Sequence, residues 1–314
     1  MTVQGMLAVA LAGAWLGGAA LAQQPAAATP APAAQPAGEK AMGRDDSAAE
    51  KLGWKLATQA WTFRDRTAFE AIETAQRLGL RYIELYPGQA LSKDQPKAQV
   101  GPDLSQEQRT ELRRKLAASG VVVVAFGVVN PGSDEAAVRR IFDFARDMGI
   151  RTITCEPADK AAWDVVEKLA NEYSIDAACH NHPKPSKYWN PDTVLEAING
   201  RGPRVGACAD VGHWPRSGLT PVDCLKKYQG HIKSLHFKDI RNNLDQPWGT
   251  GDSDARGMLK ELRRQGFQGV ISLEYESGSG KEVEENAALC IDFFDEVARE
   301  IVAEEAKEAP KSGK

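Results

Sequence analysis

Short apolar runs alternate with amphipathic helical stretches along most of this chain, and this alternation limits the fold more than any other feature. The apolar runs have the length and composition of buried strands, and they lie at 56–61, 82–85, 121–126, 152–156, 176–182, 205–210, 232–238 and 270–276. Helical periodicity fills the gaps, most clearly at 68–78, 106–118, 135–148, 161–173, 254–264 and 282–303. Eight strand–helix units in about 250 residues predict an α/β fold, a parallel sheet closed into a single-domain (β/α)₈ barrel.

Glycines mark the ends of four of these helical stretches. Gly79, Gly120, Gly149 and Gly266 each come just after a helix, where a residue with positive φ is favoured. A doubly wound open sheet is the alternative fold. It has less support, because no glycine-rich phosphate-binding fingerprint follows any of the strands.

The strands themselves have two different faces. Small or polar side chains occupy every second position of three strands: Thr152, Thr154, Glu156, Ser234, His236, Lys238, Ser272, Glu274 and Glu276. The intervening positions are apolar, so one face should pack against helices while the other points into a partly polar barrel interior. The charged or imidazole residue comes at the C-terminal end of each strand, where barrel enzymes build their active sites.

The N-terminus has the composition of a targeting segment. Residues 6–21 are almost wholly apolar or small, and the small-residue box Ala20-Leu21-Ala22 follows before Gln23. We therefore expect a signal peptide at 1–22, export to the periplasm or beyond, and no stable membrane span after cleavage. An uncleaved anchor is the alternative, because residues 1–5 carry no Lys or Arg.

Three further segments complete the expected organisation. Residues 23–48 are rich in Ala, Pro and Gln and predict a flexible linker. The barrel should span 49–306, and 307–314 should be a disordered tail.

Charge and cysteine content exclude several classes of function. The formal net charge is −4 and no basic run stands out, so we expect no nucleic-acid partner and no polyanionic substrate. The five cysteines fit neither a disulfide framework nor a zinc knuckle, which favours buried free thiols. The sequence is compatible with an oligomer.

Histidines and acidic residues gather at the predicted strand ends. Every histidine occurs after residue 179, and those at strand ends are His180, His182, His213 and His236. Acidic residues take matching positions: Glu84, Glu156, Asp210, Glu274 and Glu276. In a closed barrel these side chains converge on one mouth. A site with oxygen and nitrogen ligands suits one divalent ion, Mn²⁺, Mg²⁺ or Co²⁺, and is compatible with Zn²⁺.

Several of these residues also have simpler explanations. Glu84 could pair with a basic side chain at the mouth, and His180 could be a satisfied interior histidine. Glu276 is expected to support the ligands rather than to bind the ion. Asn181 faces the other way and is expected to be structural, and His231 precedes its strand and should lie on the surface.

Five motifs in a fixed order resemble those of a known family. They are Cys179-His180-Asn181-His182-Pro183, Ala209-Asp210-Val211-Gly212-His213-Trp214, Leu235-His236-Phe237-Lys238-Asp239, Trp248-Gly249-Thr250-Gly251-Asp252 and Ser272-Leu273-Glu274-Tyr275-Glu276. Together they resemble the xylose isomerase-like TIM barrels, in the sugar phosphate isomerase/epimerase branch and of a secreted type. The resemblance covers roughly residues 55–303.

The resemblance implies a role for each matching residue. The implied metal ligands are Glu156, Asp210, His236 and Glu274. The implied substrate-binding residues are His182, His213, Lys238, Glu84, Arg241 and Trp214. Trp61, Phe63 and Tyr86 are further candidates for the pocket wall, although aromatic residues at strand ends often serve packing alone.

The chemistry implied is removal of a proton next to a carbonyl group. A divalent ion stabilises the resulting enediolate, and a carboxylate accepts the proton. By resemblance, Glu156 and Glu274 would flank the sugar as catalytic residues. An exported enzyme of this kind should take an unphosphorylated sugar or a glycoside.

A lyase or hydrolase acting on 3-keto-glycosides is the main alternative, because it needs the same ion and base. The runs from His180 to Trp189 and from Asp210 to Ser217 resemble exported relatives implied in that chemistry.

Two less favoured alternatives come from other classes of protein function. An abasic-site endonuclease needs three zinc ions and histidines on early strands, which this chain lacks. A non-catalytic sugar-binding module would need the pocket without the ion.

Overall fold

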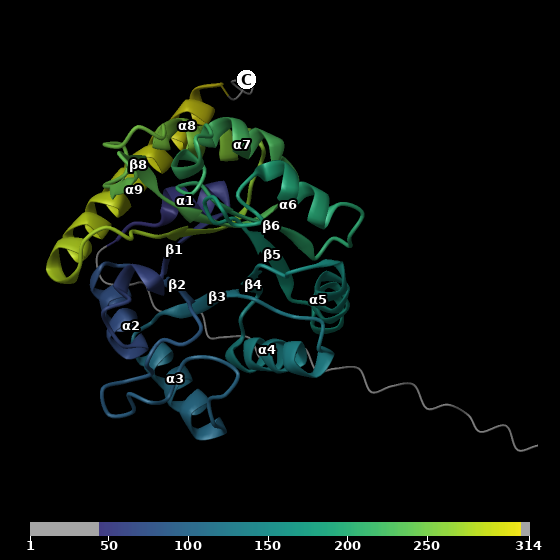
Figure 1. The fold of residues 1–314 in the computed structure, drawn as a ribbon. Coiled ribbons are helices and arrows are strands. Elements are labelled where there is room, and N and C mark those ends of the chain that lie inside the picture. The colour runs from purple at the N-terminus through teal and green to yellow at the C-terminus, as the bar shows by residue number, and fades with distance from the viewer. Residues whose placement is uncertain (1–43, 309–314) are drawn as a thin grey trace, which may run out of the picture. The chain divides into compact units, whose positions relative to one another are not determined.

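A computed structural model describes residues 44–308, and within them eight parallel strands close into a barrel (Figure 1). The strands are β1 Trp54–Gln59, β2 Tyr82–Leu85, β3 Val122–Val129, β4 Thr152–Cys155, β5 Asp176–His180, β6 Val205–Asp210, β7 Ile232–Phe237 and β10 Gly269–Leu273. Around the barrel the order is β1-β10-β7-β6-β5-β4-β3-β2, and β1 pairs in parallel with both β10 and β2. This closure confirms the predicted (β/α)₈ barrel and excludes the open sheet.

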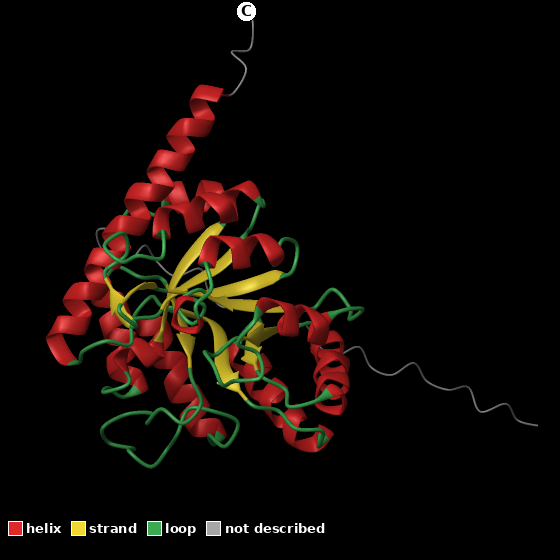
Figure 2. Ribbon diagram, turned by 45° about the horizontal axis from the view of Figure 1, so that its top comes forward, coloured by secondary structure: helices red, strands yellow, loops and turns green. Residues whose placement is uncertain are grey.

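Helices surround the strands on the outside of the barrel (Figure 2). They are α1 Ser47–Leu52, α2 Ala68–Arg77, α3 Gln106–Ala118, α4 Glu135–Met148, α5 Lys160–Tyr173, α6 Pro191–Ile198, α7 Pro221–Lys227, α8 Ala255–Arg264 and α9 Gly280–Glu308. Helix α2 begins at a capping box of Thr67 and Glu70, and the four glycines expected at helix ends all have φ between 62° and 73°. Helix α9 is longer than predicted, and its C-terminal part projects past the barrel (Figure 2).

The packed chain begins earlier than the sequence indicates. Arg44 donates to Asp295 of α9 at 2.6 Å, and Ala48 and Ala49 are buried. Residues 44–48, assigned above to the linker, therefore pack against the barrel. Helix α9 also continues to Glu308, inside the predicted tail. The predicted signal peptide and most of the linker lie outside the described residues.

A small hairpin after β7 was not anticipated. Its strands are β8 Asp239–Arg241 and β9 Leu244–Gln246, which pair antiparallel. The Asp239 carboxylate accepts hydrogen bonds from the backbone N–H groups of Gly249 and Gly251, each at 2.9 Å. A Cβ on Gly251 would lie 2.2 Å from that carboxylate, so the loop needs glycine there. Asp239 thus fixes the loop 248–252 that closes behind the hairpin.

The interior of the barrel changes character along the strands. Near the N-terminal ends, Ala57, Val124 and Val270 form a small apolar cluster of their own. Two residues further along the same strand as Val270, the interior side chain is Ser272, and Glu274 follows beyond the strand end. The alternate positions of the strands pack in the main core between sheet and helices, as the period of two predicts.

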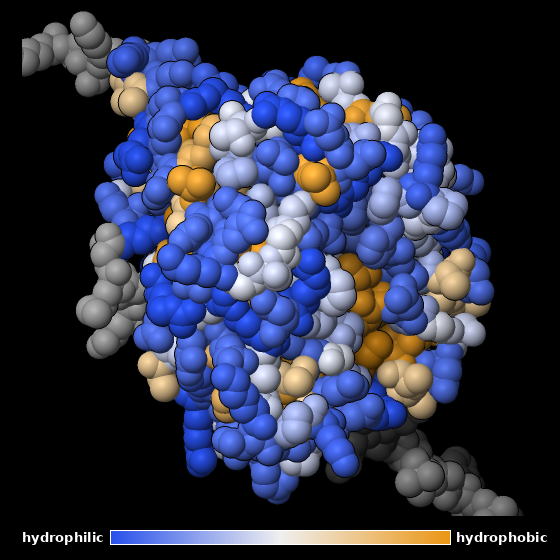
Figure 3. Space-filling view, turned by 60° about the vertical axis from the view of Figure 1, so that its left-hand side comes forward, coloured by the Kyte–Doolittle hydropathy of each residue, from blue (hydrophilic) through white to orange (hydrophobic). Residues whose placement is uncertain are grey.

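The outer surface is mostly hydrophilic on the face seen in Figure 3, with apolar residues in separate patches. All five cysteines are buried and free. Among residues 44–308, every helix is too short or too polar to cross a bilayer.

Candidate metal centre

Asp210 lies at the end of β6 and is the centre of the polar cluster at the barrel mouth. Its Oδ1 accepts hydrogen bonds from the backbone N–H groups of Gly212 and His213, both at 3.0 Å. The Asn181 amide pairs with the backbone of Asp210 in both directions at 2.9 Å, which fits the structural role expected for Asn181. These contacts fix the carboxylate and leave Oδ2 directed toward the mouth.

His236 of β7 is held between two carboxylates. Its Nε2 lies 3.0 Å from Glu84 Oε1, and its Nδ1 lies 3.2 Å from Glu274 Oε2 and 4.0 Å from Asp210 Oδ2. The hydroxyls of Thr154 and Ser272 donate to Glu84 at 2.9 and 2.7 Å. Burial alone would raise the pKa of Glu84, but the charge of His236 and these hydrogen bonds lower it. Glu84 is therefore an ionised acceptor that orients the imidazole.

Lys238 follows His236 by two residues and is completely buried. Its Nζ lies 2.5 Å from Asp210 Oδ2, contacts Glu274 Oε2, and lies 3.6 Å from Glu276 Oε2. Burial would lower the pKa of Lys238, but the surrounding carboxylates, Asp210 foremost, raise it well above its ordinary value. Lys238 is thus a permanent cation inside the cluster.

Glu156 approaches the cluster from the other side, just after β4. Its Oε1 lies 2.8 Å from His180 Nδ1 and also contacts His182 Nδ1. Burial would raise the pKa of Glu156, but the hydrogen bonds with these histidines lower it to about 2. The second nitrogen of His180, Nε2, lies 3.4 Å from Asp210 Oδ2 without making a well-directed hydrogen bond. His180 therefore connects Glu156 to Asp210.

His213 is fixed by an arginine that follows it by three residues. Arg216 Nη1 lies 3.1 Å from His213 Nδ1, and His213 Nε2 lies 3.2 Å from Asp210 Oδ2. Arginine can only donate, so Nδ1 must accept and the ring proton must sit on Nε2. Burial lowers the pKa of His213 well below its ordinary value, which agrees with a neutral ring.

Arg216 also joins the hairpin to the site. It donates to Glu276 Oε2 at 2.6 Å and to Asp245 Oδ2 of β9 at 2.8 Å. Burial would raise the pKa of Glu276, but nearby cations, Lys238 foremost, lower it to about 2. The charged network therefore continues from the cluster to the hairpin.

The described residues fit a divalent cation on three grounds. Ligand atoms of Asp210, His236 and Glu274 lie within 4.8 Å of one another, and two neighbouring groups of three share His180. The buried atoms His180 Nε2 and His236 Nδ1 lack hydrogen-bond partners although both face carboxylates. Carboxylates also outnumber cations in this region, even when the imidazoles of His180 and His236 are counted as protonated beside Lys238 and Arg216. The six carboxylates are those of Glu84, Glu156, Asp210, Glu274, Glu276 and Asp245. Such an excess of buried acid favours a bound cation.

The four predicted ligands are not equally close. Asp210, His236 and Glu274 form one group, whereas Glu156 belongs to a group with His180 and His182. An ion shared by all four would require Glu156 to reach past the His180 ring.

Three predicted substrate-binding residues do not lie where a sugar at the barrel mouth could reach them. Arg241 is exposed on the hairpin and pairs with Asp252 at 3.1 Å. Trp214 is fully buried and packs against Tyr228 at a centroid distance of 5.4 Å. Glu84 is fully buried beneath His236. The other expected members, His182, His213 and Lys238, all contact cluster carboxylates.

Of the aromatic residues expected in the pocket wall, some are exposed at the mouth and others are buried. Trp61 is 41% exposed and meets the Tyr86 ring edge-on at 5.1 Å, just after β1 and β2. Phe63 is fully buried. His231 is exposed before β7, as expected.

Arg216 and Asp245 were missed by the sequence analysis. A signal existed for Arg216, because a basic residue three positions after His213 lies within one helical turn of it. No comparable signal marks Asp245, which depends on the unanticipated hairpin.

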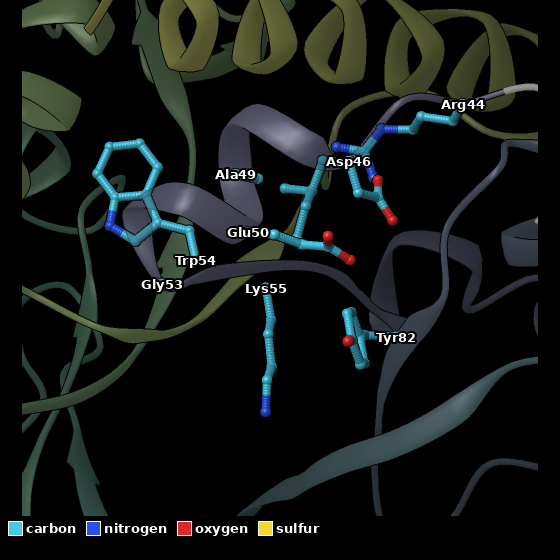
Figure 4. A pocket seen from close by; sticks show the side chains of 9 residues that line it. Arg44, Asp46, Ala49, Glu50, Gly53, Trp54, Lys55 and Tyr82 are labelled. Atoms are coloured by element: carbon cyan, nitrogen blue, oxygen red, sulfur yellow. The ribbon is translucent and has the colours of Figure 1, made fainter. Parts of the chain in front are cut away.

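A separate hollow of ≈ 170 Å³ lies at the opposite, N-terminal end of the barrel (Figure 4). Its lining includes Trp54, Tyr82 and a salt bridge of Arg44 with Asp46 at 2.5 Å. Arg44 also pairs with Asp295 of α9, and Glu50 pairs with Arg81, so the hollow lacks the acid excess of the mouth.

Comparisons with known proteins agree with this architecture. The profile of the xylose isomerase-like TIM barrel family matches residues 72–297. An uncharacterized protein from Parabacteroides distasonis ATCC 8503 is 34% identical, with a TM-score of 0.64, over 78% of this chain and 99% of its own. No curated protein gave a match.

Two further solved structures share the fold at low identity. D-psicose 3-epimerase from Clostridium cellulolyticum H10, solved with D-tagatose, is 13% identical with a TM-score of 0.62, over 78% of this chain and 99% of its own. A D-tagatose 3-epimerase-like protein is 15% identical with a TM-score of 0.61, over 79% and 99%. With the family profile matching across the barrel, the chain belongs to the xylose isomerase-like TIM barrel family.

Proposed function

We propose that the chain is a divalent-metal-dependent enzyme that isomerises or epimerises an unphosphorylated sugar by removing a proton next to a carbonyl group. One observation carries the proposal: Asp210, His236 and Glu274 bring ligand atoms within 4.8 Å of one another in a mouth with excess acid. These three residues would hold the ion, with Glu156 as the expected fourth ligand. A bound divalent ion would supply Lewis-acid stabilisation of the negative charge that develops on the sugar.

Two carboxylates are available on opposite sides of the mouth. Glu156 follows β4 and Glu274 follows β10, and these strands are half-way round the barrel from each other. Epimerisation removes a proton from one face of a carbon and returns one to the other face, so bases on both sides are useful. The low pKa of Glu156, about 2, keeps its carboxylate ionised at neutral pH, as a metal ligand requires.

The histidines would orient the sugar. His213 carries its ring proton on Nε2, because Arg216 occupies the other ring nitrogen, and this N–H can donate to Asp210 Oδ2 at 3.2 Å or to a sugar oxygen. The His182 side chain is 46% exposed beside Glu156, where it could hydrogen-bond a sugar hydroxyl. Trp61 and Tyr86 offer an apolar edge for the sugar ring.

The proposed substrate is unphosphorylated for two reasons. The cluster has more carboxylates than cations, which opposes a phosphate group. Two relatives of the same fold are named as 3-epimerases of D-psicose and D-tagatose, or as similar to them, and these names specify sugars without phosphate.

The test is a product screen by NMR in D₂O. The full protein, first stripped with a chelator and then reconstituted with Mn²⁺, Mg²⁺ or Co²⁺, is incubated with free sugars and with 3-keto-glycosides. The proposal expects deuterium at the carbon next to the carbonyl of a free sugar, and no exchange in the stripped sample. Release of the aglycone from a 3-keto-glycoside would favour the lyase instead. If metal-loaded protein exchanges no proton in any sugar, the proposal fails.

Export is a separate part of the proposal and rests on the apolar segment before Ala20-Leu21-Ala22. N-terminal sequencing of the mature protein should begin at Gln23. A mature chain that retains Met1 would contradict cleavage.

A further inference from the structure

Lys238 contacts the same carboxylate oxygens that define the candidate metal centre. We propose that the Lys238 ammonium and a divalent ion compete for Asp210 Oδ2 and Glu274 Oε2, so that Lys238 sets the affinity of the site for metal. This inference rests on the proposed metal-dependent function. It adds a role for Lys238 in controlling the ion itself, beyond the substrate contact expected from sequence.

The competition follows from the identity of the atoms. Asp210 Oδ2 lies 2.5 Å from Lys238 Nζ, and Glu274 Oε2 is a second contact of the same nitrogen. The same two oxygens are the ones nearest to His236 Nδ1, at 4.0 and 3.2 Å. An ion bound by Asp210, His236 and Glu274 would therefore take oxygens that the ammonium now contacts.

Both cations cannot keep these oxygens at once. Ligand oxygens lie about 2.0–2.2 Å from ions such as Mg²⁺ or Zn²⁺. An ammonium in contact with the same oxygens would then be next to a like charge in a site that water barely reaches, where repulsion is weakly screened. The ammonium must move when the ion binds.

Glu276 is the next acceptor for the displaced ammonium. Its Oε2 lies 3.6 Å from Lys238 Nζ, and Arg216 holds this carboxylate in place at 2.6 Å. The stem of Lys238 has little freedom, because a Cβ on Gly212 would lie 2.5 Å from its Cδ. The end of the side chain is therefore the part that can move, toward Glu276.

The test is calorimetric titration of Mn²⁺ into the chelator-stripped full-length protein, without sugar. Lys238→Met should bind Mn²⁺ about tenfold more tightly than wild type, because the internal competitor is gone. Lys260→Met, which removes one positive charge from the surface pair with Glu304, is the matched control and should bind as wild type does. Glu276→Gln retains Lys238 but removes its alternative acceptor, so Mn²⁺ binding should weaken several-fold.

The outcomes separate this inference from the proposed function. Wild type that binds Mn²⁺ and turns over sugar, with Lys238→Met binding no more tightly, overturns the competition alone. Tighter binding by Lys238→Met with no turnover of any sugar by wild type supports the competition and refutes the function. If neither protein binds a divalent ion, both fail. Should Lys238→Met not fold, unchanged Mn²⁺ affinity in Glu276→Gln overturns the competition.

Discussion

The two ends of the barrel interior are built from the same strands but carry opposite kinds of side chain. At the N-terminal end, Ala57, Val124 and Val270 pack together with Tyr82 beside them. Two residues further along β2, the interior position is occupied by Glu84, which is fully buried and ionised. Along β2 the change from an apolar to a charged side chain thus takes place within two residues.

The charges at the two ends are also balanced differently. Around the N-terminal hollow, Arg44 pairs with Asp46 and Asp295, and Arg81 pairs with Glu50. At the mouth, carboxylates outnumber permanent cations. Burial would lower the pKa of His180, but the neighbouring carboxylates of Asp210 and Glu156 raise it to about 9. Buried unbalanced charge costs stability. The difference indicates that the N-terminal end serves folding and the mouth serves chemistry.

The largest expected effect is loss of turnover from a change at the mouth. Glu274→Gln or His236→Ala removes one member of the Asp210 group, so the ion should no longer bind. Turnover should fall by at least about 10³-fold, because charge stabilisation in the transition state is lost. The fold should survive, with far-UV circular dichroism unchanged and Tm within about 4 °C of wild type. Either variant with wild-type turnover would show that the site is assigned to the wrong residues.

A change at the N-terminal end should have the opposite result: it should lower stability and leave metal binding unchanged. Trp54 is 2% exposed, donates from Nε1 to the Phe267 carbonyl at 3.0 Å and packs 5.9 Å from the Phe294 ring. Trp54→Ala should lower the free energy of unfolding by about 3–5 kcal/mol, measured in urea. Mn²⁺ affinity of the folded variant should match wild type. Trp54→Phe serves as a milder variant, and loss of metal binding in both would refute the separation of the two ends.

The sequence was sufficient for the barrel and for the position of its mouth. Strand periodicity and the glycines at helix ends report local conformation. The closed sheet confirms the strands, and the positive φ angles confirm the glycines. The strand-end rule placed His236, Asp210 and Glu274 together because parallel strands end at one face. These features depend only on spacing along the chain.

The contacts that the sequence does not predict depend on where side chains point and on how the sheet closes into a barrel. Glu84 meets His236 only because the barrel closes and brings β2 within three strands of β7, through β1 and β10, and no spacing along the chain encodes that contact. The sequence does not decide between a structural and a functional role for His180, whereas the structure places its ring between Glu156 and Asp210. The pairing of β3 with β2 and with β4 also contains register shifts. The alternation of apolar and polar residues along a strand does not predict such shifts.

A smaller effect is expected from Glu84, which lies where the two ends of the interior meet. Metal-binding histidines usually depend on a carboxylate that accepts from the other ring nitrogen, and its loss lowers metal affinity about 10–100-fold. Glu84→Gln should therefore weaken Mn²⁺ binding by this factor while leaving the fold intact, measured by calorimetry. Ser272→Ala, which removes one hydroxyl donor to Glu84, should have less effect. If Glu84→Gln left Mn²⁺ affinity unchanged, Glu84 would serve folding, like the residues at the N-terminal end of the barrel, and would have no role in metal binding.

The smallest effect on stability is expected outside the barrel. Ion pairs there are as short as those at the mouth, but they are exposed to solvent. Arg256 of α8 pairs with Glu296 of α9 at 2.7 Å and also contacts Glu300, with its side chain 38% exposed. Exposed pairs of this kind contribute less than about 1 kcal/mol and are screened by salt. Arg256→Ala should thus lower the free energy of unfolding by less than that amount, and the difference from wild type should shrink at high salt. A loss above about 2 kcal/mol would mean that α9 depends on this pair, and that surface charge contributes to stability here as much as core packing does.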